Sequence, residues 1–455
     1  ARDKSMENYF NLIHFPLMTQ SFANIVKDRK YVTDELAQAA RSASGVRAEL
    51  LKLSVDWCKK LAEGNYAPAT RVNAVLLLGE LNDVEGKVPV PHRPALKYLL
   101  ELSENPSIPV EVRQAALVGV QRHLELDNLA AAEKANNRIP KADLDAVIEK
   151  MLALVSAKSP PENVDRKAFT LMQRRAASIL GAYGQVGENN KVYDALVNVV
   201  ADDEASLWVR SDAAIALGRL NYNEAQVDSA KGARSLGALV AYAANEELET
   251  LKKQSESGGA VGGGGYGGPG MGRPGMGGPR GGGPSAPGGG AGLGAPGGAG
   301  PGAPVGGGPS SPGPGGLAGG GGRFGGGGAF GGMGGGSGTY YPENLVTPMI
   351  RRMLAIVTSA QIGLDGANGR GAPGLRKPRQ DVALDRIAEN IEKLKGHLVR
   401  LQKKQDAQSE VFREFRLAIV DVEAAAGVKK KAGAAPANPQ DAPTDPGEGG
   451  QVGGN

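Results

Sequence analysis

The chain has 455 residues and a formal net charge of +4, and its acidic and basic residues are interspersed. This balance argues against nucleic acid or a membrane surface as the main partner. The only cysteine, Cys58, excludes a disulfide within the chain, and no stretch approaches the ~18 apolar residues that a membrane-spanning helix needs.

Glycine is unevenly distributed along the chain. Most of the 69 glycines lie in one central stretch. Outside this stretch the sequence is rich in Ala, Leu, Val, Glu, Lys and Arg and poor in aromatic residues, which is the composition of helices rather than strands. We therefore expect an all-α protein in which a low-complexity segment separates two foldable parts.

Residues 1–62 are predicted to form a helical cap. Tyr9, Ile13 and neighbouring apolar residues open the chain, and Pro16 is expected to break or bend the first helix. From residue 49 to residue 61 apolar side chains recur along a helix that we expect to bury Cys58. Because the terminal repeats of a helical array are usually atypical, a cap is the natural interpretation of this segment.

Residues 63–256 contain an internal repeat. Each copy has an apolar residue, an arginine, two spacers and a small residue, followed by apolar residues and often glycine. The arginines are 42, 62 and 35 residues apart, which fits helical hairpins with an insertion of about 20 residues within 127–161. Residues 142–157 of this insertion still predict a helix. The arginines that mark the repeat are Arg71, Arg113, Arg175 and Arg210.

The residue types of this repeat suit stacked helices. Small residues such as Ala115 and Ala213 let neighbouring helices approach closely, while Leu and Val at three- and four-residue spacing fill the seam. With its Val-Arg pair followed by Ala-Ala and Leu-Gly, the segment over about residues 60–245 resembles the HEAT-repeat family. The resemblance implies a right-handed α-solenoid of armadillo type, with the repeated residues on the second helix of each hairpin. It also implies an extended surface for a protein or peptide.

The repeated arginines have two interpretations. In one, they form a basic stripe along a groove that contacts an acidic partner or a nucleic-acid backbone. In the other, each arginine spans neighbouring hairpins, with its aliphatic stem packed and its guanidinium hydrogen-bonded. We favour the structural interpretation, because an arginine at the same place in every repeat more often holds the repeat together.

Residues 257–338 are almost wholly Gly, Pro, Ala and Ser, and Arg273, Arg280 and Arg323 are their only charges. This composition cannot bury enough apolar surface to offset the entropy of ordering, so we predict a disordered tether. Glycine–arginine segments can also bind RNA. Three arginines give little electrostatic attraction, however, and a spacer is the favoured interpretation.

Helical structure is expected again over residues 339–426. Residues 344–362 predict one amphipathic helix, followed by a polar loop. Beyond it, apolar residues recur three and four apart from Leu384 to Val422, interrupted by polar Gln405 and Gln408, which predicts a long coiled-coil helix or a helical hairpin. The tail at 427–455 is expected to be loose. The predicted self-association seam comprises Ile387, Ile391, Leu394, Leu398, Leu401, Phe412, Phe415 and Ile419.

The sequence predicts no catalytic group, cofactor or metal site. Asp202-Asp203 and Glu246-Glu247 are adjacent residues, which point in different directions on a helix and make poor carboxylate pairs. The four histidines lie in different predicted elements without a partner at ligand spacing; they are His14, His92, His123 and His397.

Three functions of different classes are therefore considered. The favoured one is a non-enzymatic scaffold that binds a protein or peptide, with a C-terminal helix that either self-associates or folds back onto the repeats. The second is nucleic-acid binding, as in some HEAT-like proteins, which the even charge balance argues against. The third is enzymatic, because HEAT-like proteins include bilin lyases, lyase-associated subunits and base-excision glycosylases.

The chain starts at Ala1 rather than Met, so a signal peptide would already be gone, and we leave both cytoplasm and cell envelope open.

Overall fold

The computed structural model describes residues 2–20, 25–39, 44–133, 138–223, 225–259, 341–367, 374–376 and 381–428. Within these ranges the fold is all-α, as the composition predicts, apart from two short strands. Beyond their first residues, the predicted tether at 257–338 and the predicted tail at 427–455 lie outside the described residues. Among the helices that the structure describes, none is both long and apolar enough to cross a membrane.

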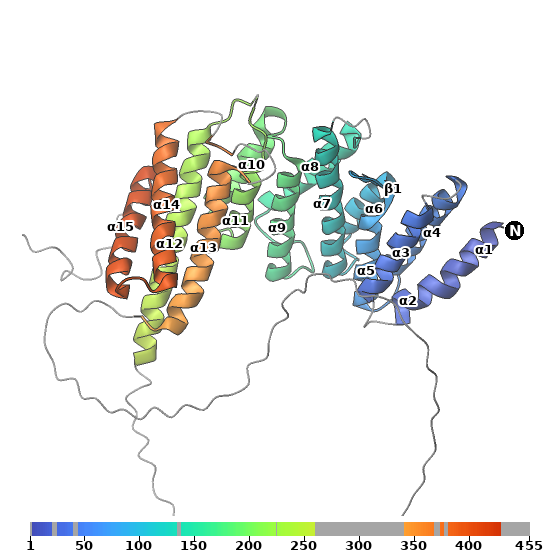
Figure 1. Cartoon of the computed structure of the whole chain (residues 1–455), viewed down its shortest axis with the longest axis horizontal. Coiled ribbons are helices and arrows are strands. Elements are labelled where there is room, and N and C mark those ends of the chain that lie inside the picture. The colour runs from blue at the N-terminus through green and yellow to red at the C-terminus, as the bar shows by residue number, and fades with distance from the viewer. Residues whose placement is uncertain are drawn as a thin grey trace, which may run out of the picture. The chain divides into compact units, whose positions relative to one another are not determined.

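The N-terminal segment is helical, as predicted, and precedes the repeated hairpins (Figure 1). It contains α1 (Arg2–Tyr9), a π-helical turn (Phe10–His14), α2 (Phe15–Gln20) and α3 (Ile25–Ala39). Pro16 lies inside this unbroken helical run, two residues after the π-helical turn, and because it supplies no N–H and crowds the preceding turn it disturbs the regular α-helical hydrogen bonding there. The helical geometry therefore changes just before Pro16, near the predicted break.

Four helical hairpins follow, each a pair of helices joined by a short loop. Their bounds are α4 (Ser44–Glu63) with α5 (Pro68–Glu80), α6 (Arg93–Glu104) with α7 (Val110–Ala132), α8 (Lys141–Ser156) with α9 (Arg166–Tyr183), and α10 (Lys191–Ala201) with α11 (Leu207–Leu217). A short 3-10 turn, Glu188–Asn190, precedes α10. The insertion predicted within 127–161 contributes the end of α7 and the whole of α8.

A small β-hairpin, which the sequence did not suggest, connects α5 to α6. Strand β1 (Asn82–Val84) pairs in antiparallel with β2 (Val90–Pro91). Each strand has at most three residues, so no alternating apolar pattern is long enough to be recognised in the sequence.

The hairpins stack in chain order. Within each hairpin the two helices pack on each other, and the second helices α5, α7, α9 and α11 pack in succession. Alanines at the contact positions, such as Ala116, Ala177 and Ala214, are fully buried. The result is one continuous hydrophobic cluster rather than a separate core for each hairpin.

The C-terminal helices continue this stack. Helix α12 (Ser229–Gly259) packs on α10, and α13 (Glu343–Asp365) packs on both α11 and α12. Helix α13 thus takes the next second-helix position, and residues 260–342 connect the two helices of a fifth pair. Residues on both sides of the glycine-rich tract accordingly belong to one compact unit.

A last hairpin, α14 (Val382–Lys403) and α15 (Gln408–Ala426), packs on α12 and α13. The long three–four periodicity therefore belongs to a hairpin, which was one of its two predicted forms. The chain reverses at Lys404, whose backbone is left-handed with φ of 52°, close to the polar Gln405 and Gln408. The hydrophobic cluster extends from Met18 to Val422 and so includes both ends of the described chain.

Candidate protein-binding surface

Three of the four repeat arginines make the same hydrogen bond. In each case the guanidinium Nε of an arginine in the first turn of a second helix donates to the carbonyl of the penultimate residue of the preceding helix. The bonds are Arg71 to Ala62 at 2.8 Å, Arg113 to Ser103 at 2.9 Å and Arg210 to Val200 at 2.9 Å. These arginines therefore fix the turn within each hairpin.

The position of this bond explains why a charged group is tolerated there. The last carbonyls of a helix lack partners within the helix, and they carry the negative end of its dipole. Arg113 and Arg210 are only 5% and 2% exposed, and burial lowers the pKa of both guanidinium groups from the ordinary value. Because they are buried, these two side chains are not available to a partner in a groove.

Arg175 does not share this arrangement. Its Nη1 donates to Gln121 Oε1 on α7 at 2.6 Å. The equivalent bond comes from Gln173, whose Nε2 donates to the Ala157 carbonyl at 2.8 Å, just beyond the end of α8. Gln173 also precedes Ala176 by three residues, as Arg210 precedes Ala213. In the third hairpin the repeat register is therefore two residues from the one that the arginines suggest.

The repeat glycines mark close contacts between second helices. A Cβ on Gly79 would lie 2.7 Å from the Cα of Gly119, which joins α5 to α7, and one on Gly181 would lie 3.0 Å from the Cα of Ala216, which joins α9 to α11. A Cβ on Gly218 would lie 1.8 Å from the carbonyl oxygen of Ile362 on α13. Glycine is therefore required where the backbones meet.

Two large apolar side chains are exposed at equivalent positions on neighbouring second helices. Leu171 and Trp208 precede Gln173 and Arg210, respectively, by two residues, and they are 51% and 43% exposed. Arg174 joins them: its Nε lies 2.6 Å from Asp212 Oδ2, and its guanidinium carbon lies 5.8 Å from the centroid of the Trp208 ring. We call Leu171, Arg174, Trp208 and Asp212 the Trp208 patch.

A pocket of about 240 Å³ adjoins this patch. It lies between the loop that joins α8 to α9 and the loop that joins α10 to α11, and Thr170 and Ser206 line it close to Leu171 and Trp208 in the chain. An ion pair between Lys158 Nζ and Asp202 Oδ2, at 2.6 Å, links the two loops. The Trp208 patch therefore combines an exposed aromatic ring, a fixed arginine and an adjacent concavity.

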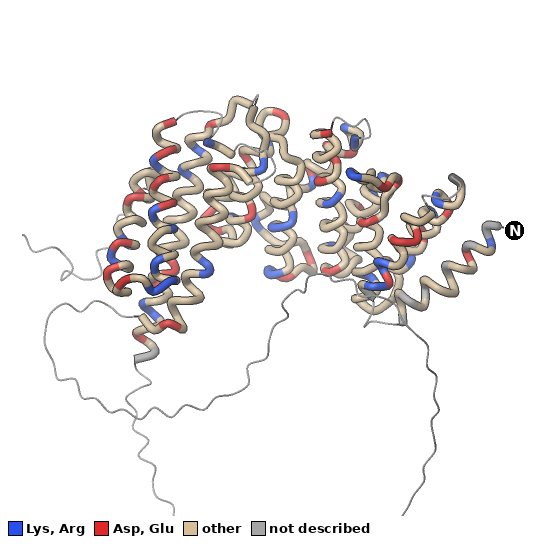
Figure 2. Tube along the Cα trace, in the orientation of Figure 1, with Lys and Arg blue, Asp and Glu red and all other residues tan. Residues whose placement is uncertain are grey.

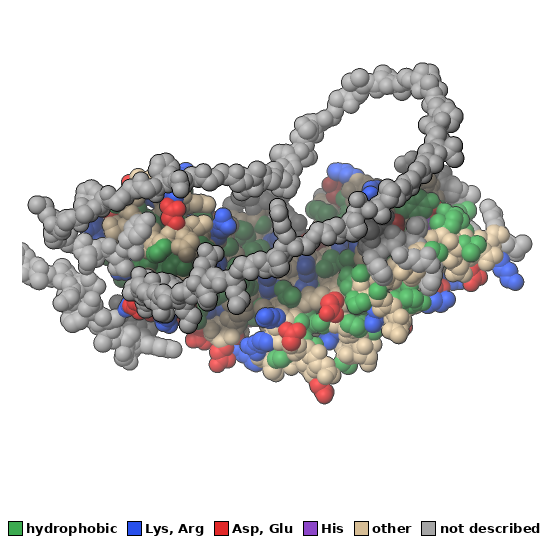
Figure 3. Space-filling model, turned by 90° about the horizontal axis from the view of Figure 1, so that it is seen from below, with side chains coloured by type: hydrophobic (Ala, Val, Ile, Leu, Met, Phe, Trp, Pro, Cys, Tyr) green, Lys and Arg blue, Asp and Glu red, His purple; other side chains and the backbone are tan. Residues whose placement is uncertain are grey.

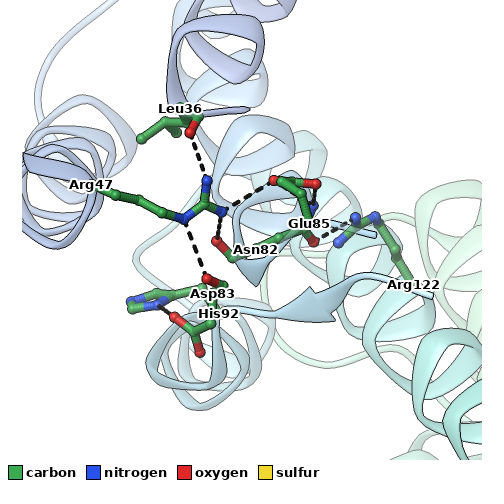
Figure 4. A network of polar contacts seen from close by, with 7 residues as sticks. All are labelled: Leu36, Arg47, Asn82, Asp83, Glu85, His92 and Arg122. Atoms are coloured by element: carbon green, nitrogen blue, oxygen red, sulfur yellow. Dashed lines mark hydrogen bonds and ion pairs between the residues drawn. The ribbon is translucent and has the colours of Figure 1, made fainter. Parts of the chain in front are cut away.

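A second polar network joins the cap to the first hairpins (Figure 4). The Arg47 guanidinium on α4 donates to the carbonyl oxygens of Leu36 at 2.6 Å and Asn82 at 2.7 Å. On the other side, Arg122 of α7 donates to the Gly79 carbonyl at 3.0 Å and to Asn82 Oδ1 at 2.8 Å. Since these donors bind backbone and amide groups of the fold itself, the network has a structural role.

Acidic and basic residues are interspersed along the helices (Figure 2). The face shown in Figure 3 likewise has acidic, basic and hydrophobic side chains side by side, without a large area of one sign. This distribution agrees with the even charge balance of the sequence. No extended basic stripe is visible on the part of that face that the grey residues leave uncovered.

The predicted self-association seam lies inside the chain. All eight of its residues, Ile387, Ile391, Leu394, Leu398, Leu401, Phe412, Phe415 and Ile419, are buried in the packing of α14 and α15 on α12 and α13. A second copy could reach these side chains only after the hairpin had separated from the stack.

The four histidines lie in different elements, as their sequence positions suggested, although His92 is close enough to His123 to help lower its pKa. His14 Nε2 lies 2.8 Å from Glu35, His92 Nδ1 lies 2.6 Å from Asp83, and His397 Nδ1 lies 3.4 Å from Glu414. His123 is buried in α7. In the described ranges, no three His, Cys, Asp or Glu residues are grouped so that they could hold a metal ion.

The Trp208 patch was not found from the sequence. A tryptophan at the start of an amphipathic helix is commonly buried, so its type gives no signal. The sequence does indicate the patch by position: Leu171 precedes Gln173 by two residues, as Trp208 precedes Arg210. Recognising it requires the third-hairpin register, which the neighbouring pair Arg174-Arg175 obscures.

Comparisons of the chain with models of protein families, with curated proteins and with solved structures gave no match.

Proposed function

We propose that this protein is a non-enzymatic scaffold that binds a protein or peptide partner through the second helices of a right-handed, HEAT-type α-solenoid. The stacked hairpins, their recurrent arginine bond and their glycine contacts support the HEAT assignment. In such an array the same face of each repeat is presented side by side, which creates a long surface for a partner.

The observation that carries this proposal is the Trp208 patch. Protein interfaces concentrate their binding energy in a few aromatic and arginine side chains that lie in well-packed surroundings. Trp208 is exposed but is held in place by Arg174, which Asp212 orients in turn. A partner that covers the indole ring would bury apolar area without first having to order the side chain.

The adjoining pocket suggests the form of the partner. Its lining contains amide and hydroxyl groups from Gln173, Asn198 and Ser206. An apolar side chain of the partner would cover Leu171 and Trp208, while its backbone or a polar side chain would enter the pocket. An extended peptide or a loop fits this arrangement better than a flat surface does.

Nucleic acid is the weaker alternative. Arg113 and Arg210, two of the arginines that would form a basic stripe, are buried, and each donates a hydrogen bond to a backbone carbonyl. Binding to phosphates would require exposed cations that release counterions, and it would weaken steeply with salt.

The test is capture of native partners by the tagged full chain, with and without the patch. The variant Leu171→Ala/Trp208→Ala should lose roughly tenfold or more of the partner that the wild type retains, since each side chain is placed as an interface anchor. Leu129→Ala is the matched control, because Leu129 is an exposed leucine on a second helix away from the patch.

Circular dichroism should show equal helicity for all three proteins. Equal capture by the patch variant and the wild type would refute the proposal. Capture that disappears after nuclease treatment of the extract would refute it in favour of nucleic-acid binding.

A further inference from the structure

Exposed apolar side chains gather at the two ends of the stack. Fifteen large hydrophobic residues in the described ranges are exposed, and nine of them lie between α1 and α3, in the last hairpin or just after it. At the N-terminal end they are Tyr9, Leu12, Ile13, Val26 and Tyr31, and at the C-terminal end they are Val382, Leu417, Val420 and Val428. Repeat arrays that end in water usually carry polar outer faces on their terminal repeats.

The C-terminal end presents a helical stripe. Helix α15 packs on α12 and α14, and its opposite face contains Leu417, Val420 and Ala424, at three- and four-residue spacing. Leu417 is 61% exposed. This spacing places the side chains on one side of the helix, in the pattern by which other helices of the stack seat their neighbours. Helix α15 thus has the surface of an internal helix without the next hairpin.

At the N-terminal end the exposed Tyr9 and Tyr31 pack against the ring of the buried His14. The ring centroids of Tyr9 and His14 lie 5.4 Å apart, and those of His14 and Tyr31 lie 5.8 Å apart. The Tyr9 hydroxyl donates to Glu35 Oε1 at 2.6 Å, which fixes α1 against α3. Leu12, which follows on the same segment, is 76% exposed. The first helices therefore form a fixed apolar surface on the outside of the stack.

The two surfaces lie at opposite ends of the stack (Figure 1). In the part of the chain that the structure describes, every internal hairpin has a neighbour on both sides, whereas no described helix covers the outer side of the first helices or of α15. A second copy of the chain supplies both missing neighbours at once, because its first helices would continue the stack beyond α15. The contact would extend the interface that already joins the hairpins.

Charges at the two surfaces are complementary. Glu410 and Asp421 are exposed on the outer side of α15 and have no ion-pair partner in the described part of the chain. Lys27, next to Val26 on α3, is likewise exposed and makes no ion pair with a described residue. Arg413 is also exposed on the α15 stripe, whereas the exposed Asp34 of α3 pairs with Lys30 on its own helix.

We propose that the chain associates with itself head to tail, with the N-terminal patch of one copy against the α15 stripe of the next. Such a contact is heterologous, since it joins two different surfaces. Each added copy leaves one free surface of each kind, so association continues beyond a dimer unless a ring closes. The Trp208 patch takes no part in this contact, and the inference is independent of the proposed partner.

The test is sedimentation velocity of the full chain from about 1 to 100 µM, the range expected for a small interface. The wild type should form species that grow beyond a dimer with concentration. Leu12→Asp and Leu417→Asp should each lower the association constant roughly tenfold or more, because each places a charge within the contact. Both residues are largely exposed, so the folded monomer should tolerate either change.

Mixing the two variants distinguishes this arrangement from a two-fold dimer. Leu12→Asp retains a working α15 stripe and Leu417→Asp retains a working N-terminal patch, so an equimolar mixture should form a dimer and nothing larger. The control variant Leu129→Asp, at an exposed leucine of α7, should associate as the wild type does.

Three results would overturn the proposal. The first is a wild-type protein that stays monomeric up to 100 µM. The second is a homodimer formed by either variant alone with undiminished affinity, which indicates a two-fold interface. The third is a mixture that stays monomeric while circular dichroism shows both variants to be folded.

Discussion

Gly218 at the C-terminal end of α11 and Ile362 of α13 are 144 residues apart in the sequence, yet their backbones touch: a Cβ on Gly218 would lie 1.8 Å from the Ile362 carbonyl oxygen. A neighbouring contact has the same character, since a Cβ on Gly363 would lie 2.9 Å from the Ala214 carbonyl oxygen. These contacts are the point at which the segment after the glycine-rich tract joins the stack. Their effect on stability and assembly can be measured.

Gly218→Ala should destabilise the protein. The added methyl group has only backbone atoms to displace, and overpacking of this kind typically costs about 1–3 kcal/mol. Gly396→Ala is a matched control, since Gly396 lies in the interior of α14 with nothing within 4 Å of an added Cβ. There the alanine should stabilise by about 0.5–1 kcal/mol. Urea denaturation of both variants gives the two free-energy changes, and equal signs would contradict the α11–α13 contact.

Arg113→Ala and Arg210→Ala should each lower the free energy of unfolding. Each removes a hydrogen bond to a penultimate helix carbonyl and the packing of a buried aliphatic stem, and we expect a loss of roughly 2–4 kcal/mol. Arg234→Ala serves as the control, because Arg234 is exposed on α12 and should change stability by less than about 0.5 kcal/mol. Similar values for all three variants would mean that these buried arginines do not stabilise the hairpins.

His123 should make the protein less stable in acid. Burial, helped by Arg122 and His92, lowers the pKa of His123 from 6.5 to about 3. The folded state therefore favours the neutral imidazole, so its contribution is complete above about pH 6.5 and is lost as the pH falls toward 3. Within this window the free energy of unfolding should fall by up to about 1.4 kcal/mol per pH unit because of this group.

His123→Leu should remove this part of the pH dependence. Unfolding by urea at several pH values, compared between the variant and the wild type, isolates the contribution of His123 from that of the carboxylates. Parallel curves for the two proteins between pH 6.5 and 4 would show that His123 does not titrate as the structure indicates.

Cleavage between α12 and α13 should leave the protein assembled. A protease site introduced near residue 300 divides the chain within the connection of the fifth helix pair. The bidentate ion pair of Arg352 with Glu247, at 2.5 and 2.6 Å, and the hydrogen bond from Asn245 to Glu423, at 2.8 Å, still join the two pieces across their apolar interface. Size-exclusion chromatography after cleavage should show co-elution in buffer and separation in denaturant. Separate elution in buffer would contradict the packing of α13 on α11.

Local sequence patterns predicted the helices better than their long-range partners. The spacing of Arg71, Arg113 and Arg210 identified three hairpins because each arginine bonds within its own hairpin, about ten residues away. The third hairpin was placed two residues out of register because Gln173, rather than an arginine, makes the equivalent bond. A glutamine is a sufficient donor there, but it interrupts the series of arginines by which the repeat is recognised in the sequence.

The position of α13 could not be read from the sequence for a different reason. Gly218 occurs where the repeat often has glycine, and nothing local indicates that the helix it meets lies beyond the glycine-rich tract. The periodicity of residues 384–422 defined the apolar face of α14 and α15, but an apolar face fits a second copy as well as α12. Only the assembled contacts decide between them, and they place this face inside one chain.

The long connection within the fifth helix pair also affects how the protein is made. A ribosome adds roughly 5–20 residues per second, so α12 is complete roughly 4–17 seconds before α13 begins to emerge, since 83 residues separate Gly259 from Glu343. During this interval the apolar sides of α11 and α12 that pack on α13 in the finished fold have not yet met it. Chaperones that bind nascent polypeptides therefore have a defined window, and a defined surface, on which to act.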